Sequence, residues 1–210
     1  TLIILAAKAG RDNEFSSIKK IGSDSNLLID LQIQNLGIEF GQKIIVLGEF
    51  AEMWKLKGYK KIVNNDWQFT SSGYSLSLAL PHVQKKNDVW ILYADILFRK
   101  IDHSNLQKDV NLLFVDASWG NRIFKREQRD NSLIELTVLD NTKRINLFQD
   151  GYHTNNAKQY SELCGLMRFN YESIMQLISI TNNLSVDELK NLSTSNLLEI
   201  ARQQGLHFYG

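Results

Sequence analysis

The sequence predicts an α/β domain whose mostly parallel sheet is flanked by helices. Short runs of consecutive apolar residues alternate with amphipathic segments along the chain. The apolar runs lack the alternation of polar and apolar residues that marks a strand with one exposed face. They are therefore typical of strands buried on both faces, as in parallel sheets. The order strand, loop, helix, strand recurs three or four times, and this order is typical of α/β proteins.

The apolar runs are the expected strands, at residues 1–7, 43–48, 88–95 and 111–117. The segment after the first strand is amphipathic. Leucines such as Leu27 and Leu31 recur there near helical spacing, and Gly37 is a typical stop signal. We therefore expect the first helix within residues 25–38.

Further helices are expected in the middle and at the end of the chain. Residues 50–59 and 74–82 both have helical character, and Pro81, the only proline, ends the second. Residues 171–204 also predict helices. Their plausible N-caps are hydroxyl side chains that can accept hydrogen bonds from the first turn, namely Ser185 and either Ser193 or Thr194.

The segment 118–160 differs from the rest, because it predicts an antiparallel pair of strands that turns at Asp140–Asn141. This pair is expected to form a small antiparallel lid or side sheet. We find no internal repeat, low-complexity linker or domain boundary, so residues 1–210 are expected to form a single domain. Because the sequence starts on Thr1 and stops abruptly at Gly210, we expect a piece truncated at its C-terminus.

Composition limits the class of partner. The net charge is +1, so no overall field recruits nucleic acid or an anionic membrane, and a phosphate-bearing ligand must be held by a local site. Cys164 is the only cysteine, which excludes an internal disulfide and fits a reducing, cytoplasmic compartment. No apolar run reaches the roughly 20 residues that a membrane span needs, and the N-terminus lacks a charged signal region. We therefore expect no membrane insertion.

Candidate functional residues follow two of the expected strands. Ligands of open parallel sheets bind beyond the carboxyl ends of the strands, and Asp95 ends the strand at 88–95. The loop after the first strand contains small residues such as Ala9 and Gly10, which would let backbone N–H groups approach a phosphate. Three alternatives stay open: a tight turn in that loop, a strand-end cap at Asp95, and a solvated face for the pair Lys19 and Lys20.

Six stretches, in order across residues 2–169, together resemble one enzyme superfamily. They are ILAAKAGRD, IKKIGSDSNLLIDLQIQNL, VNNDWQFTSSGYSLSLA, VWILYADILF, FVDASW and SELCGLMRF. They resemble the nucleotidyltransferases that activate sugar 1-phosphates and phosphocholine, above all bacterial phosphocholine cytidylyltransferases and their phosphonate-activating relatives. The resemblance implies a Rossmann-like nucleotidyltransferase fold with a mostly parallel, mixed sheet.

The resemblance also implies an activity. A nucleoside triphosphate, CTP by this resemblance, would be joined to a small phosphorylated substrate such as phosphocholine with release of pyrophosphate. Asp95 would bind Mg²⁺, and Lys19 would neutralise the developing charge, with Lys20 as the fallback. The residues expected to bind the nucleotide are Leu5, Ala6, Ala7, Lys8, Ala9, Gly10, Arg11, Lys19, Ser72 and Ser75.

Three residues are expected to bind the acceptor. Trp119 lies where the choline-activating branch has a tryptophan, whose face can hold a quaternary ammonium group. Asp116 and Glu162 would add negative charge around that cation. The alternative for Trp119 is that it packs the lid onto the core, and packing is the role we assign to Trp54, Trp67 and Trp90. A homodimer is compatible with the resemblance.

Several positions depart from the family pattern. Lys8 replaces the first loop glycine, and Asp12 stands where the family has an arginine, unless Arg11 fills that role. Ala94 replaces the glycine before Asp95, and serines replace the paired asparagines before Tyr74. Lys8, Asp12 and Ala94 favour an alternative, a degenerate domain with a binding or regulatory role, whereas Asp95, Lys19 and the turn at Tyr74–Ser75 favour the enzyme. A glycosyltransferase that uses a nucleotide-sugar is a further alternative, although its usual motif has two carboxylates and this one has a single aspartate.

Overall fold

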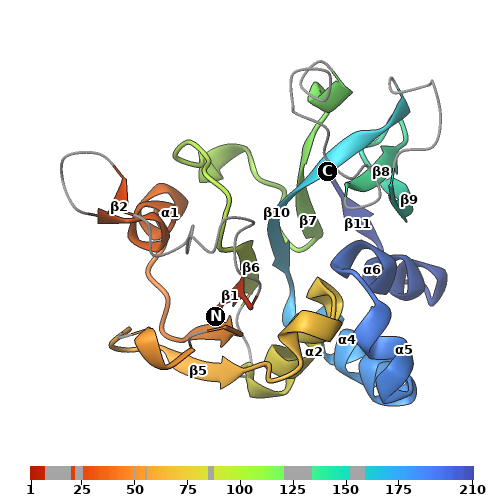
Figure 1. The fold of residues 1–210 in the computed structure, drawn as a ribbon. Helices are drawn as coiled ribbons and strands as arrows, with labels where there is room; N and C mark the ends of the chain where they lie inside the picture. The colour runs from red at the N-terminus through yellow and green to blue at the C-terminus, as the bar shows by residue number, and fades with distance from the viewer. Residues whose placement is uncertain are drawn as a thin grey trace.

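A mixed sheet forms the centre of the molecule. The structure is a computed structural model that describes residues 1–7, 20–21, 26–49, 51–54, 56–84, 88–120, 134–151 and 159–210. In this part of the chain, nine strands form one sheet whose main path runs β11-β7-β10-β6-β1-β4-β5, with β8 and β9 attached through β10 (Figure 1). The strands are β1 (Leu2–Ala6), β4 (Lys43–Leu47), β5 (Lys60–Val63), β6 (Val89–Tyr93), β7 (Asn111–Asp116), β8 (Glu135–Leu139), β9 (Ile145–Asp150), β10 (Ser161–Phe169) and β11 (Phe208–Tyr209).

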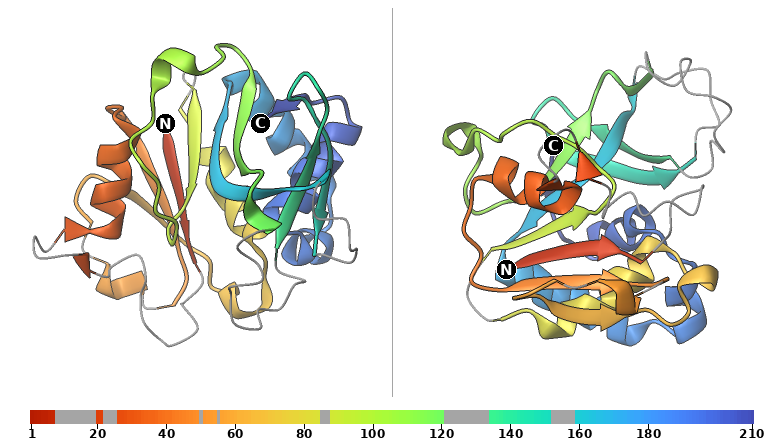
Figure 2. Two further views of the ribbon diagram at one scale, coloured as in Figure 1. Left: turned by 90° about the horizontal axis from the view of Figure 1, so that it is seen from above. Right: turned by 60° about the vertical axis from the view of Figure 1, so that its left-hand side comes forward.

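The helices cover both faces of this sheet, as Figure 2 shows, with α1 on one face and α2, α4, α5 and α6 on the other. A separate short hairpin pairs β2 (Lys20–Ile21) with β3 (Asn26–Leu27). The helices are α1 (Leu28–Leu36), α2 (Ser72–Ala79), α4 (Tyr171–Asn183), α5 (Val186–Asn191) and α6 (Thr194–Gln203). Among the residues that the structure describes, no helix is both long enough and apolar enough to span a membrane.

β1 is buried on both of its faces, as its unbroken apolar sequence predicts. It pairs in parallel with β4 on one side and β6 on the other. Its side chains alternate between two cores: Ile3 packs in the core beneath α2, α4 and α6, whereas Leu2 and Ile4 pack in the core beneath α1. The predicted α/β fold with a mostly parallel centre is therefore confirmed.

The sheet contains an antiparallel strand that the sequence does not reveal. β10 lies between β6 and β7 and runs antiparallel to both. Its register shifts between Leu163 and Met167, and Gly165 has a φ of +73° in this irregular stretch. The glycine also lets the ring of Tyr93 approach, because a Cβ at Gly165 would lie 2.7 Å from Tyr93 Cδ2.

Most expected helices are present, but one is wrong. Gly37, with φ +64°, follows α1 as predicted, and α2 ends in a 3₁₀ turn that contains Pro81. Residues 50–59 do not form the expected helix; their described part contains only a 3₁₀ turn at Ala51–Met53. Trp54 is buried there, and Gly58 has a φ of +81°, which a continuing helix cannot contain.

The antiparallel pair predicted within residues 118–160 is confirmed by β8 and β9. Their connection begins at Asp140, whose carboxylate accepts hydrogen bonds from the N–H groups of Thr142 and Arg144. β8 also pairs with β10, so this hairpin continues the main sheet. Residues 121–133 and 152–158 of the same segment lie outside the described ranges.

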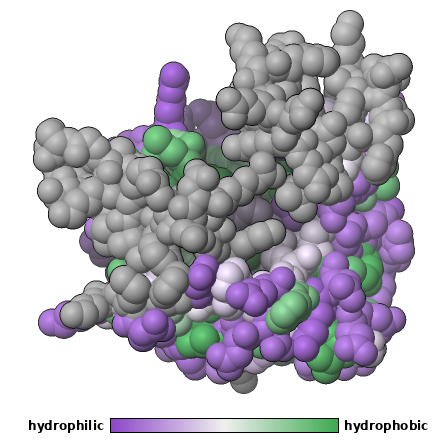
Figure 3. All heavy atoms as spheres, viewed as in Figure 1, coloured by the Kyte–Doolittle hydropathy of each residue, from purple (hydrophilic) through white to green (hydrophobic). Residues whose placement is uncertain are grey.

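The predicted C-terminal helices are confirmed, and their caps explain where they begin. Ser185 and Glu188 form a reciprocal capping box at the start of α5, and the Ser193 side chain accepts from Asn196 N–H at the start of α6. Figure 3 shows mostly polar side chains, with scattered apolar ones, over the face that α2, α4 and α5 form. Such scattered apolar residues are ordinary for a protein surface.

Gly48 allows the end of β4 to pack against the chain that leaves β1. A Cβ at Gly48 would lie 1.9 Å from the carbonyl oxygen of Ala7 and 2.8 Å from Trp67 Cβ. We expect Gly48→Ala to lower the free energy of unfolding by about 1–3 kcal/mol, because backbone atoms must move to admit the methyl group. Urea denaturation measures this loss.

Gly41→Ala is the matched control, since nothing lies within 4 Å of a Cβ at that position just before the same strand. It should stay within about 1 kcal/mol of the wild type. If both variants lose the same free energy of unfolding, the close contact with Ala7 is not the reason that position 48 needs a glycine.

Candidate functional site

Two predicted functional segments leave the sheet at the same edge. Leu5 in β1 lies opposite Tyr93 in the parallel neighbour β6. Two residues beyond this pair are Ala7, which leads into the loop after β1, and the exposed Asp95, which lies in the turn after β6 because the strand ends at Tyr93. Parallel strands end at a common edge, so the candidate metal ligand and the start of the candidate phosphate loop lie at the same edge of the sheet. The other predicted residues of the loop, Lys8, Ala9, Gly10, Arg11 and Lys19, lie outside the described residues.

The backbone at this edge is closely paired. Ala94 N–H donates to the Leu5 carbonyl at 3.0 Å, which ties the turn that contains Asp95 to β1. Ala94 is 4% exposed and packs in the core beneath α1. It is not among the described residues with a positive φ, so alanine fits here without the conformational freedom of a glycine.

Asp95 could hold a divalent cation only together with a bound ligand. Among the residues that the structure describes, no group of three or more His, Cys, Asp or Glu side chains could hold a metal ion. Mg²⁺ is commonly bound by one or two carboxylates together with phosphate oxygens and water. An exposed aspartate at the carboxyl end of a central strand meets that requirement, whereas a closed protein cage would not form in this part of the chain.

The two predicted nucleotide-binding serines lie at the start of α2 and have partners within the protein. Ser75 is 5% exposed and accepts a hydrogen bond from Asn64 Nδ2 at 3.1 Å. Ser72 Oγ accepts from Thr194 N–H at 2.8 Å and donates to Glu135 at 3.5 Å. The structure therefore uses both hydroxyl groups to join α2 to its neighbours, and a contact with nucleotide stays a prediction.

Asn64 is a residue of this edge that the sequence reasoning missed. It follows β5, is 1% exposed, and donates through Nδ2 to Thr70 Oγ1 at 2.8 Å as well as to Ser75. Its Oδ1 accepts from Asp66 N–H at 3.1 Å. Asn64 lies in one of the stretches that carry the resemblance, VNNDWQFTSSGYSLSLA, three residues before Trp67.

A buried carboxylate joins the end of β6 to α6. Tyr93 Oη donates to Glu135 Oε2 at 2.8 Å, and Ser195 N–H, in the first turn of α6, donates to Oε1 at 3.3 Å. Burial raises the pKa of Glu135 to about 7, with a further contribution from the charge of Asp150, although its hydrogen bonds oppose the shift. Burial likewise raises the pKa of the Tyr93 phenol. No sequence pattern marks Glu135, which lies within an ordinary strand.

The residues predicted to bind the acceptor lie on and after β7 and β10. Asp116 and Glu162 are directly opposite one another in this antiparallel pair, so their side chains emerge on the same face. Trp119 is 1% exposed and packs with Leu136 and Tyr160, and its indole N–H donates to the Tyr160 carbonyl at 2.7 Å. This burial matches the packing alternative for Trp119, while contact of the three residues with an acceptor stays a prediction.

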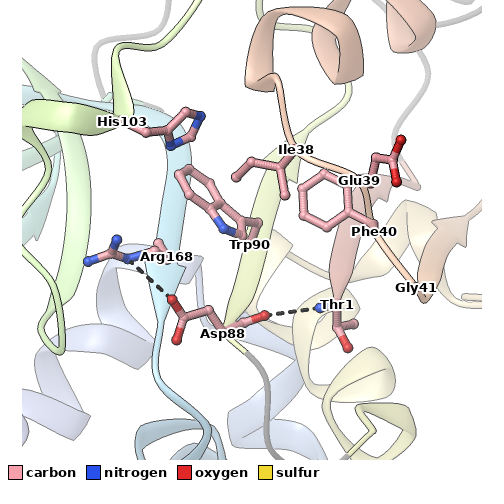
Figure 4. A pocket seen from close by; sticks show the side chains of 9 residues that line it. All are labelled: Thr1, Ile38, Glu39, Phe40, Gly41, Asp88, Trp90, His103 and Arg168. Atoms are coloured by element: carbon pink, nitrogen blue, oxygen red, sulfur yellow. Dashed lines mark hydrogen bonds and ion pairs between the residues drawn. The ribbon is translucent and has the colours of Figure 1, made fainter.

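A cleft of about 530 Å³ lies at the other end of the parallel strands (Figure 4). Thr1 and Asp88, which line it, precede β1 and β6, so the cleft opens at the amino ends of these strands. Arg168 Nε lies 3.9 Å from Asp88 Oδ2, and its Nη2 donates to the carbonyls of Gln107 and Val110. These contacts join β10 to neighbouring segments. The cleft is separate from the edge that carries Asp95.

Comparison with known proteins shows the fold alone. No protein-family model and no curated protein sequence matches the chain. Among solved structures, it is similar to the CTP:phosphocholine cytidylyltransferase of Streptococcus pneumoniae (TM-score 0.69, 16% identity, covering 99% of this chain and 87% of that one). It is also similar to the inositol-1-phosphate CTP transferase of T. maritima (TM-score 0.69, 18% identity, 99% and 83%). A putative glucose-1-phosphate thymidylyltransferase of Bacillus anthracis matches with TM-score 0.69 and 12% identity, covering 99% and 84%. The fold is that of the nucleotidyltransferases.

Glu135 should make stability depend on pH. A carboxyl group with a pKa of about 7 in the folded chain and a lower value in the unfolded chain binds its proton more tightly when folded. Its ionisation therefore destabilises the fold progressively as pH rises from about 4 through 7. Glu135→Gln keeps a donor and an acceptor without the charge. We expect the free energy of unfolding of this variant, measured by urea denaturation, to be higher than that of the wild type by roughly 2–3 kcal/mol at pH 8. Near pH 4 the two values should be equal.

Glu199→Gln is the contrasting control. Burial raises the pKa of Glu199, but hydrogen bonds from Arg202 and from the Phe148 N–H lower it by more. The pKa of Glu199 is therefore below its usual value. Its removal should destabilise the protein at neutral pH, and the loss should shrink as pH falls. A gap between Glu135→Gln and wild type that is constant from pH 4 to 8 would contradict the raised pKa.

Proposed function

We propose that the protein is a Mg²⁺-dependent nucleotidyltransferase that joins a nucleoside triphosphate, CTP in the first instance, to a small phosphorylated substrate such as phosphocholine. The observation that carries the proposal is the exposed Asp95 at the end of β6, beside the exit of β1, within a nucleotidyltransferase fold. The phosphocholine cytidylyltransferase and the inositol-1-phosphate CTP transferase among the similar structures support CTP as the first nucleotide to test.

The proposed reaction is an in-line displacement. A phosphate oxygen of the acceptor attacks the α-phosphorus of the triphosphate, the new P–O bond forms, and the bond between the α-phosphorus and the bridging oxygen breaks. The electron pair leaves with pyrophosphate. Because two anions must meet, catalysis of this kind consists mainly of neutralising charge and positioning the reactants.

The roles of the chain's own residues follow from that requirement. A bound Mg²⁺ would supply positive charge at the phosphates, and the Asp95 carboxylate would hold it. Backbone N–H groups of residues 7–11 would cradle the triphosphate where the chain leaves β1. Lys19 would neutralise negative charge near the reacting phosphorus. Ala7, where this segment begins, packs closely against Gly48 at the same edge of the sheet.

The acceptor would lie toward β7 and β10. Asp116 and Glu162 are opposite one another on adjacent strands, and a pair of carboxylates on one face favours a cationic headgroup such as trimethylammonium. Trp119, with its ring buried, would act by supporting this face from within. Phosphocholine has a cationic headgroup, which suits the two carboxylates, and a phosphate, which supplies the attacking oxygen.

A degenerate domain that binds nucleotide without turnover is the second candidate, because the side chains at two motif positions are unfavourable for binding a triphosphate as the family does. Lys8 replaces a glycine, and Asp12 places negative charge where the family has an arginine. Ala94, the third departure, does not add to this case, since its backbone needs no glycine.

The first experiment measures pyrophosphate release. CTP, ATP, GTP and UTP are each incubated with phosphocholine, aminoethylphosphonate and sugar 1-phosphates, with and without Mg²⁺. We expect release with at least one pair, only with the metal, and fastest with CTP and phosphocholine. Nucleotide binding without release would favour the degenerate domain. Transfer of a sugar from a nucleotide-sugar without release of pyrophosphate would favour the glycosyltransferase.

Asp95→Ala and Asp95→Asn test the metal ligand. We expect both to lower metal-dependent turnover by at least roughly 10²-fold, because a divalent cation contributes several kcal/mol of charge stabilisation. Thermal unfolding should be unchanged, since Asp95 is exposed. Glu172→Ala, which removes an exposed carboxylate in the first turn of α4, is the control and should keep its turnover. Full activity in either Asp95 variant would refute the assignment.

A further inference from the structure

Gln32 is a polar side chain in the middle of an apolar face. It belongs to α1, is 0% exposed, and lies between Ile29 and Leu36, which pack in the core beneath that helix. Its Oε1 has no hydrogen-bond partner within the described residues. Burying an amide with one half unsatisfied costs free energy that an apolar side chain would avoid. The position therefore uses the amide for something other than packing.

The amide nitrogen of Gln32 bonds to both sides of the turn that contains Asp95. Nε2 donates to the Tyr93 carbonyl at 3.2 Å and to the Ile96 carbonyl at 2.5 Å. One acceptor precedes Asp95 by two residues, and the other follows it directly. Together with the bond from Ala94 N–H to the Leu5 carbonyl, these contacts hold the Asp95 backbone against both α1 and β1.

Few side chains could make this double contact. It needs two N–H donors on one nitrogen and no charge, and among residues of this length glutamine alone meets both conditions. Glutamate is an acceptor when ionised and would face two carbonyl oxygens. Leucine and methionine fill a similar volume and donate nothing. Lysine would bring a charge into an apolar core.

We propose that Gln32 is a positioning residue, which orients the Asp95 carboxylate to bind a divalent cation together with the phosphates of a nucleotide. The inference rests on the proposed function, because it takes Asp95 as the metal ligand. Residues that hydrogen-bond to a metal ligand commonly weaken metal binding when they are removed. Here the partner acts through the backbone on each side of the ligand.

Gln32→Met and Gln32→Leu test the proposal in the full chain. Both remove the donors and place an apolar side chain in an apolar core, so both should fold, with thermal stability equal to or above that of the wild type. The matched control is Asn35→Leu. Asn35 lies on the same helix and donates to the Phe98 carbonyl of the same loop at 2.6 Å, but this contact does not flank Asp95.

Two readouts are needed besides turnover. The first is amide hydrogen exchange of the peptide that spans residues 94–98, which should become faster in the Gln32 variants. The second is Mn²⁺ affinity measured by electron paramagnetic resonance in the presence of CTP, ATP, GTP or UTP. We expect it to weaken about 10- to 100-fold in both Gln32 variants and to stay unchanged in Asn35→Leu. The Mg²⁺ concentration for half-maximal turnover should rise correspondingly, with the KM for the acceptor unchanged.

The outcomes separate this inference from the proposed function. If Asp95→Ala loses Mn²⁺ affinity and the Gln32 variants keep it, the metal site stands and the positioning role is wrong. Unchanged exchange at residues 94–98 also overturns the positioning role, whatever the metal does. If Asp95→Ala binds Mn²⁺ like the wild type, the metal assignment is wrong and the inference fails with it. If Asn35→Leu loses as much Mn²⁺ affinity as the Gln32 variants, then losing any contact between α1 and this loop weakens the metal site. That result would also overturn the positioning role of Gln32.

Discussion

Burial of β1 between β4 and β6 is the constraint on which the rest of the structure depends. Its side chains alternate between two apolar cores, so the strand cannot shift by one residue without exchanging those cores. The register of β1 with β6 follows, and it brings Ala7 and Asp95 to the same edge. The chemistry that we propose there is thus a consequence of core packing, since the apolar strands determine where the polar residues emerge.

Buried polar side chains then hold the turns that the strands lead into. Asn64 holds the turn after β5, and Glu135 joins the end of β6 to the start of α6 through Tyr93 and Ser195. Gln32 holds the turn at Asp95. Each of these groups is costly to bury unless it is hydrogen-bonded, so each discourages other arrangements of its turn. A rigid set of turns suits a site that must position two anionic reactants.

The sequence was sufficient for the features that depend on local pattern. The unbroken apolar runs predicted β1, β4, β6 and β7, and a strand-end position marked Asp95. It was not sufficient for β10, because the insertion of an antiparallel strand between β6 and β7 depends on contacts between distant segments. The helix expected at residues 50–59 was wrong, because the described part of this segment contains only a 3₁₀ turn and Gly58 adopts a φ of +81°. Glu135 could not be found, since its partners come from segments far apart in the chain.

We propose that nucleotide and metal bind together at the carboxyl ends of β1 and β6. A crystal structure of the protein with Mn²⁺ and a non-hydrolysable CTP analogue tests it most directly, because the anomalous signal of manganese locates the ion without assumptions. We expect a manganese peak about 2.2 Å from an Asp95 carboxylate oxygen, with the triphosphate against the chain that leaves β1. Nucleotide in the cleft beside Trp90 and Arg168 instead, or manganese remote from Asp95, would contradict it.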